Sequence, residues 1–176
     1  MTKFRHNYVR ALRLMTEEEK KLIQGCVAGK PVAQKELYIH YGPMIKGICQ
    51  RYTASNEEAE DLFHDTFVFI LSNFKNFTHI SSLTGWLRRI TVNKAIDYYR
   101  STHRYYQDSI DDLPEEIAEQ KSLINETLSL EKIMQFINEL PDKYRIAINL
   151  YLIEDIDQGK IAKMMNESPT NVRTLI

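Results

Sequence analysis

Glycine and cysteine are scarce in this chain of 176 residues, which contains six Gly and two Cys. So little glycine argues against a β architecture with many turns and against the Gly-rich loops that cradle phosphates. Cys26 and Cys49 form no CxxC pair, and a disulfide scaffold of this size would carry more cysteines. These features predict two reduced thiols in a cytosolic protein.

Long hydrophobic runs are also missing. No stretch of the sequence approaches the roughly 18 apolar residues of a membrane span. The first thirteen residues carry four cations but lack the apolar core of a signal peptide. We therefore expect a cytoplasmic protein with no membrane insertion.

Neither sign of charge dominates, because 23 Lys and Arg residues meet 24 Asp and Glu residues for a net charge of −1. This balance excludes a uniformly basic nucleic-acid binder, although it allows a local basic patch. Hydrophobic residues make up 43% of the chain, which is enough to build a buried core.

Signals for helices cover almost the whole chain and predict an all-α fold. Thr16 and Ser55 each begin a capping-box pattern, with Glu three residues later. Pro31 suits the first position of a helix, whereas Gly42-Pro43 should bend or interrupt that same helix. We expect helices at about 16–28, 31–52, 57–74, 83–104, 123–137, 142–153 and 157–165, a loop over 73–82, and a last helix from Ser168-Pro169.

A change of composition divides the chain into two helical domains. Six acidic residues and Pro114 crowd together after Tyr105 with few aliphatic residues, which is typical of a linker. We expect an N-terminal tail at 1–15, a first domain at 16–104, an acidic flexible linker at 105–122 and a second domain at 123–176.

The helix expected at 57–74 has an acidic face. Its apolar residues recur every three or four positions and predict one buried stripe. Glu57, Asp61, Asp65 and Val68 fall on the opposite side. An acid such as Glu57 also suits the dipole at the start of a helix, but Asp61 and Asp65 beside an exposed Val68 favour a docking surface.

The segment 86–104 is strongly basic. It holds Arg88, Arg89, Lys94, Arg100 and Arg104 against the single acid Asp97, interleaved with Trp86 and tyrosines. Cations with stacking rings suit a nucleic-acid strand, above all one with unpaired bases. A solvated basic helix with its aromatic residues in the core is the alternative, and for any single Arg it is the better one.

The last part of the chain has the proportions of a helix-turn-helix. A short helix at 157–165, a turn at Asn166-Glu167 and a helix capped by Ser168 predict that motif, and an ordinary pair of helices is an equally good interpretation. Ile161, Ala162 and Met165 should face the core. Thr170, Asn171 and Arg173 should lie nearest to base edges or phosphates.

Catalytic patterns are weak. Asp61 and His64 have the spacing of carboxylate-bridged metal helices, but the motif occurs once and His64 falls on the polar side. The sequence has no phosphate loop, nucleophile elbow or zinc-ligand spacing. We expect no metal, no cofactor and no enzymatic activity.

Taken together, these segments resemble bacterial extracytoplasmic-function sigma factors of the sigma-70 superfamily, over nearly all of 22–176. Residues 58–67 look like the family's polymerase-binding helix, and residues 86–100 look like its segment for melting and reading the minus-ten element. Residues 140–145 look like the start of its fourth region, and Ile161-Ala162 falls at the matching place in its helix-turn-helix.

The resemblance implies a sigma factor that brings RNA polymerase core to a promoter and helps to open the duplex. Its partners would be the beta-prime and beta subunits of the core, promoter DNA and an anti-sigma factor. The face of Glu57, Asp61, Asp65 and Val68 would meet the core.

DNA contacts are implied at two places. The minus-ten element would meet Trp86, Arg88, Arg89, Asn93, Lys94, Asp97 and Arg100, with an extruded base held by Asn76, Phe77, His79 and Ser81 of the preceding loop. The minus-thirty-five element would meet Ser168, Thr170, Asn171 and Arg173.

Departures from the family affect the second of these places, among them Gly159, which weakens the short helix in which it sits. Asn166 replaces the usual Gly of the turn, which is tolerable because Asn accepts left-handed backbone angles. The family continues beyond the position of Ile176 with a basic stretch, so we expect a recognition helix that is cut short and binds weakly. Either the stretch is missing from this sequence, which we favour, or the protein relies on its minus-ten contacts. A DNA-binding regulator that acts without polymerase, or a helical anti-factor or adaptor, are the alternative functions.

Overall fold

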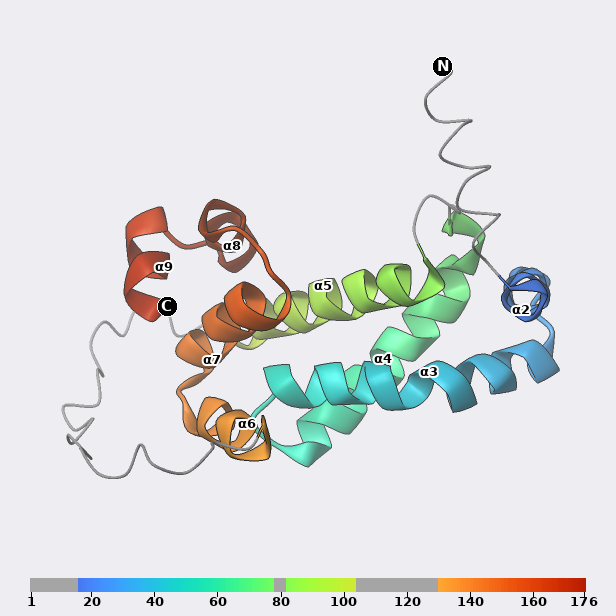
Figure 1. Ribbon diagram of the computed structural model, residues 1–176, viewed down its shortest axis with the longest axis horizontal. Coiled ribbons are helices and arrows are strands. Elements are labelled where there is room, and N and C mark those ends of the chain that lie inside the picture. Colours follow the sequence, from blue (N-terminus) through green and yellow to red (C-terminus); the bar gives the residue numbers. More distant parts are fainter. Residues whose placement is uncertain (1–15, 78–81, 104–129) are drawn as a thin grey trace, which may run out of the picture. The chain divides into compact units, whose positions relative to one another are not determined.

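The computed structural model describes residues 16–77, 82–103 and 130–176, and within them every regular element is a helix (Figure 1). The all-α prediction is therefore confirmed. The elements are α2 (Glu17–Val27), α3 (Pro31–Tyr52), α4 (Asn56–Asn73), the 3₁₀ turn η1 (Phe74–Asn76), α5 (Leu83–His103), α6 (Leu130–Glu139), α7 (Asp142–Ile148), the π-helical turn η2 (Asn149–Ile153), α8 (Gln158–Met165) and α9 (Pro169–Leu175).

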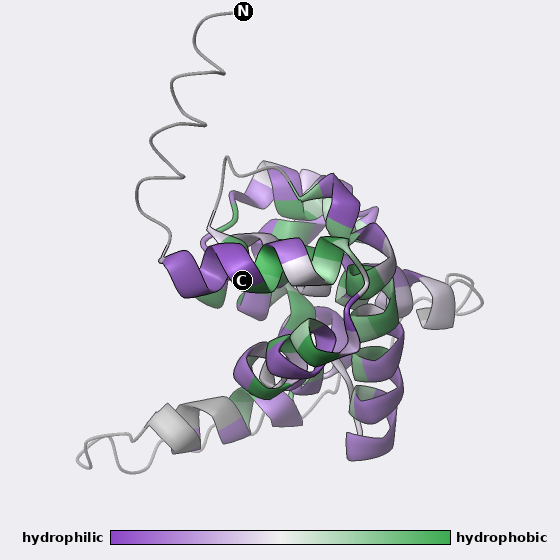
Figure 2. Cartoon of the chain, turned by 90° about the vertical axis from the view of Figure 1, so that its right-hand side faces the viewer, coloured by the Kyte–Doolittle hydropathy of each residue, from purple (hydrophilic) through white to green (hydrophobic). Residues whose placement is uncertain are grey.

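The chain forms two compact units, which divide within α5 between Ala95 and Ile96. In the first unit, α3 packs against both α2 and α4, and η1 packs against α2 and α4. In the second unit, α7 packs against α6, η2 and α9, and α8 packs against α9. Figure 2 shows hydrophobic and hydrophilic residues alternating around individual helices, as expected for helices that bury one side only.

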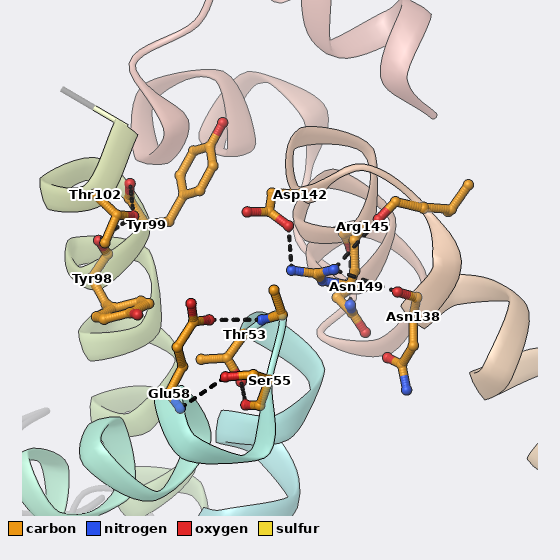
Figure 3. Close-up of polar contacts among 12 residues, drawn as sticks. Thr53, Ser55, Glu58, Tyr98, Tyr99, Thr102, Asn138, Asp142, Arg145 and Asn149 are labelled. Atoms are coloured by element: carbon orange, nitrogen blue, oxygen red, sulfur yellow. Dashed lines mark hydrogen bonds and ion pairs between the residues drawn. The ribbon is translucent and has the colours of Figure 1, made fainter. Parts of the chain in front are cut away.

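Capping bonds explain where two helices of the first unit begin. The Thr16 hydroxyl accepts from the Glu19 N–H at 3.1 Å, and the Glu19 carboxylate accepts from the Thr16 N–H at 3.2 Å, which confirms that capping box. At the start of α4, Ser55 accepts from the Glu58 N–H at 3.2 Å (Figure 3). There the Glu58 carboxylate accepts instead from the Ala54 N–H at 2.9 Å, one residue earlier than the motif predicts.

The interruption expected at Gly42-Pro43 does not occur, because α3 is one helix from Pro31 to Tyr52. Pro43 is exposed, so water can satisfy the backbone carbonyl that loses its N–H donor. Gly42 is buried, and a Cβ there would lie 3.8 Å from the Phe63 ring of α4. Packing of α3 on α4 therefore supports the helix through its weakest point.

An aromatic cluster joins the end of α4 to the start of α5. The Trp86 ring lies 5.3 Å from the Phe74 ring and 5.2 Å from the Phe77 ring, both edge to face. All three side chains are buried, with Trp86 only 6% exposed. Such ring pairs add to the hydrophobic effect, so the cluster anchors the start of α5 to the first unit.

A buried arginine closes the turn between α6 and α7. The Arg145 guanidinium lies 2.5 Å from the Asp142 carboxylate (Figure 3) and donates to the backbone carbonyls of Asn138 and Leu140 at 3.5 and 3.4 Å. These contacts connect the end of α6, the turn that follows it and the start of α7.

The prediction of a single α-helix over 142–153 is wrong. Its last five residues form the π-helical turn η2, in which the Glu154 N–H reaches the Asn149 carbonyl at 3.1 Å. The buried Asn149 amide donates to the Arg145 carbonyl at 2.9 Å, and such side-chain bonds compete with the backbone ladder of an α-helix. The element ends at Ile153, and Asp155, two residues later, has a φ of 52°.

Candidate functional site

The acidic face expected on α4 is exposed in the structure. Glu57, Asp61, Asp65 and Val68 all face solvent, and 64% of Val68 is exposed. The stripe of Ala59, Leu62, Phe63, Phe67 and Ile70 is buried on the other side, as its spacing predicted. One helix thus presents carboxylates and an aliphatic side chain together on a surface that the core does not use.

Other acids of α4 have local tasks. Glu58 accepts the Ala54 N–H at the start of the helix, and Glu60 forms an ion pair with Lys46 of α3. The hydrogen bond to Glu60 raises the pKa of Lys46 above its ordinary value. The structure therefore separates the acids that stabilise the helix pair from those that face outward.

The basic helix α5 presents a polar stripe of its predicted DNA-binding residues. Arg89, Asn93, Asp97 and Arg100 follow at steps of three or four residues, and all four are exposed. The Arg100 guanidinium lies 3.6 Å from the Asp97 carboxylate, so the one acid of this stripe orients its neighbour. The opposite side of the helix carries buried residues such as Leu87 and Ala95.

Arg88 and Lys94 lie beside this stripe and are half-buried. The Lys94 ammonium sits 4.2 Å from the centre of the Phe69 ring of α4. This cation–π contact holds the Lys94 side chain against its own unit. Sequence reasoning did not find the role of Phe69, because the two residues lie 25 positions apart.

The loop before α5 is described only in part. Asn76 is exposed and its amide donates to the Asn73 side chain at 3.2 Å. Phe77 is 7% exposed and belongs to the aromatic cluster with Trp86. His79 and Ser81 lie outside the described residues.

The helix pair α8 and α9 has the geometry expected of a helix-turn-helix. Ile161, Ala162 and Met165 are buried, as predicted. Asn166 adopts the left-handed conformation with a φ of 58° and ends α8. The turn expected at Asn166-Glu167 is therefore made by an Asn in the left-handed conformation.

Ser168 caps α9 by accepting from the Asn171 N–H at 3.1 Å. Thr170, Asn171 and Arg173 are exposed, whereas Val172 and Leu175 are buried. The predicted base-reading residues thus share the outer side of α9.

Glu167 is a residue of this region that sequence reasoning missed. One of its carboxylate oxygens lies 2.8 Å from the Lys143 ammonium of α7, and the other accepts from the Asn171 side-chain amide at 3.1 Å. The spacing of four residues between Glu167 and Asn171 was a usable signal, whereas the contact with Lys143 required the fold.

Within the described ranges, no group of three or more His, Cys, Asp or Glu side chains could hold a metal ion. Across residues 16–77, 82–103 and 130–176, no helix has both the length and the apolar character needed to cross a membrane.

Comparison with known proteins identifies two family segments in order. Residues 37–105 match the family described as Sigma-70 region 2, and residues 130–176 match the family described as Sigma-70, region 4. These matches cover the polar surfaces of α4 and α5 and the helix pair α8–α9.

Two relatives are similar to this chain over most of its length. ECF RNA polymerase sigma factor SigW of Bacillus subtilis is 29% identical over 168 residues, covering 89% of this chain and 90% of the relative. SigM of the same organism is 27% identical over 143 residues, covering 80% and 86%. The solved structure of RpoE with the anti-sigma factor NepR from Bartonella quintana aligns at 22% identity and a TM-score of 0.46, covering 81% of this chain and 88% of that one.

Proposed function

The chain belongs to the sigma-70 family, among its extracytoplasmic-function members, and we propose that its exposed helix faces divide the work of transcription initiation between them. The protein directs RNA polymerase core to specific promoters and assists in opening the duplex. The observation that carries this function is the pair of oppositely charged surfaces, on α4 and α5, within the segment matching region 2.

The α4 face of Glu57, Asp61, Asp65 and Val68 binds the polymerase core, through its beta-prime and beta subunits. Exposed carboxylates attract a basic partner and steer its approach, and the exposed aliphatic side chain adds apolar area to bury.

The α5 segment binds the minus-ten element. Arg88, Arg89, Lys94 and Arg100 contact phosphates or the displaced strand, because cations at a helix surface mainly meet the backbone of DNA. Asn93 and Asp97 share the exposed stripe with Arg89 and Arg100. Base choice falls to the loop that contains Asn76, His79 and Ser81.

The buried rings of Trp86 and Phe77 support the minus-ten surface from beneath. The α9 residues Ser168, Thr170, Asn171 and Arg173 contact the minus-thirty-five element. The proposed linker at 105–122, between a domain at 16–104 and one at 123–176, lies outside the described residues. An anti-sigma factor is a further partner, in line with the complex reported for RpoE. The protein acts in the cytoplasm as a binding factor without catalysis.

The test is co-purification with the polymerase core. A sigma factor should be recovered together with the core. A DNA-binding regulator would bind promoter duplex without the core, and an adaptor would bind neither of them.

Replacing both Asp61 and Asp65 with Lys turns two attractive contacts into repulsive ones, so we expect core affinity to fall by several kcal/mol. Both side chains face solvent, so helicity is expected to stay unchanged. The control is Glu36→Lys, which reverses an exposed charge on α3 outside the proposed surface. If the double variant binds the core as tightly as the wild-type chain does, the α4 face is not part of the polymerase interface.

A further inference from the structure

We propose that Glu167 is a positioning residue for promoter recognition, which holds the Asn171 amide in the orientation that favours adenine. The inference rests on the proposed contact of α9 with the minus-thirty-five element. It assigns a task to a residue that is not itself a base-reading side chain.

The geometry places Glu167 between two structural elements. It occupies the turn between α8 and α9, where one carboxylate oxygen accepts from the Asn171 Nδ2 at 3.1 Å. The other oxygen lies 2.8 Å from the Lys143 Nζ at the start of α7. Only 16% of the Glu167 side chain is exposed, so the carboxylate is held by two partners and shielded from water.

The chemistry of a carboxylate settles which end of the Asn171 amide it binds. An ionised carboxylate can only accept hydrogen bonds, so the NH₂ end of the amide must face Glu167. The amide is planar, so its Oδ1 is then turned away from Glu167, on a residue of α9 that is exposed. Without Glu167, rotation about the last side-chain torsion would exchange the two ends of the amide at little cost.

This orientation matters because bases differ in what they present in the major groove. Adenine offers an N6 donor beside an N7 acceptor, which pair with the Oδ1 and the remaining N–H of an Asn side chain. Guanine offers two acceptors, O6 and N7, and an outward Oδ1 opposes one of them. Holding Asn171 in one orientation therefore favours adenine before DNA arrives, which lowers the entropy lost on binding.

Lys143 completes the arrangement. Its ammonium balances the Glu167 charge, which would otherwise repel the phosphates of an approaching duplex. The cation also holds the carboxylate from the side of α7, so that Glu167 in the turn keeps its position beside α9.

The experiment measures holoenzyme binding to duplexes in which each base pair of the minus-thirty-five element is substituted in turn. We expect the wild-type chain to prefer adenine at one position. Glu167→Ala and Asn171→Ala each reduce the preference at that same position, by about tenfold if the bidentate contact is lost. Because both act through one contact, the double variant is expected to lose no more than Asn171→Ala alone.

Two further variants separate positioning from charge and from folding. Glu167→Asp keeps the negative charge but shortens the side chain, so it should also reduce the adenine preference. Glu139→Ala removes one acid of the same unit whose carboxylate is bound by Gln135, and it should leave the preference unchanged. Circular dichroism checks that each variant keeps its helices.

Two results would overturn the inference alone. One is a full adenine preference in both Glu167→Ala and Glu167→Asp. The other is an equal rise in affinity for every duplex in Glu167→Ala, which would mean that Glu167 only repels phosphates. If the wild-type holoenzyme shows no preference at any position of the element, the proposed role of α9 in reading DNA fails together with the inference.

Discussion

Burial at two single positions determines the chemistry of the thiols. Cys49 is fully buried in α3, and loss of hydration raises the pKa of its thiol to about 12. Burial likewise raises the pKa of Cys26 to about 11, and the negative charge of Glu36 adds to the effect. The reactive thiolate is therefore almost absent at neutral pH, so both residues act as small apolar side chains.

We expect neither Cys26 nor Cys49 to react with a thiol reagent at pH 8 in the folded protein. Both should react once the chain is unfolded in denaturant, which serves as the control. Because each folded-state pKa lies above the ordinary value of 9.0, the stabilisation is complete below pH 9 and is lost as the pH rises toward 11 and 12. Denaturant titrations at pH 8 and pH 10 measure that loss, and rapid labelling of native protein would contradict the assignment.

A second prediction at the residue scale concerns Trp86. Its ring is buried between Phe74 and Phe77, so Trp86→Ala should lower the free energy of unfolding by about 3–5 kcal/mol. Thermal or denaturant unfolding measures the change. A Trp86→Ala protein that is fully stable yet fails to open promoters would show that this ring works on DNA instead.

At the scale of the element, the contact between α2 and α3 depends on one small residue. A Cβ built on Gly25 would lie 2.5 Å from the Ala33 Cβ, which is closer than two such atoms can approach. The Ala33 Cβ is attached directly to the backbone, so the clash can be relieved only by moving a helix. Gly47 of α3 is also helical, but a Cβ there would meet nothing within 4 Å.

Gly25→Ala should therefore destabilise the first unit by about 1–3 kcal/mol through overpacking. Gly47→Ala is the matched control and should stabilise by about 0.5–1 kcal/mol, because Ala loses less backbone freedom than Gly in a helix. Adding Ala33→Gly to Gly25→Ala should recover part of the loss, since it removes the opposing methyl group. Equal effects of the two Gly substitutions would refute the close contact of α2 with α3.

At the scale of the whole molecule, the net charge of −1 does not reveal the acidic surface of α4 or the basic surface of α5. The outward acids of α4 and the exposed cations of α5 have opposite signs, and the two surfaces are proposed to attract different partners. Composition alone therefore says little about binding to nucleic acid.

The cations of α5 predict that binding to promoter DNA depends on the salt concentration. Arg88→Ala combined with Arg89→Ala should reduce open-complex formation by the holoenzyme. The plot of log affinity against log salt should become shallower by roughly 1.4–1.8 if both cations contact phosphates, because each neutralised phosphate releases counterions. Removing both cations without any change in slope would place them away from the DNA backbone.

Local patterns in the sequence predicted much of the fold and part of the candidate surfaces. The buried stripe of α4, the Thr16 capping box and the left-handed Asn166 all depend on residues within four positions of one another. Helical spacing likewise predicted that Asp61, Asp65 and Val68 would face solvent, because a helix that buries one side must expose the other.

The sequence by itself thus determined that the chain is all-α and, through its motifs, that it belongs to a sigma-factor family. Only the tertiary structure decided that α3 runs through Pro43, that Phe69 holds Lys94 and that Lys143 meets Glu167. Caps and periodicity act over one or two helical turns, so they can be read along the chain. Contacts between helices join residues far apart in sequence, and which pairs meet depends on how those helices pack.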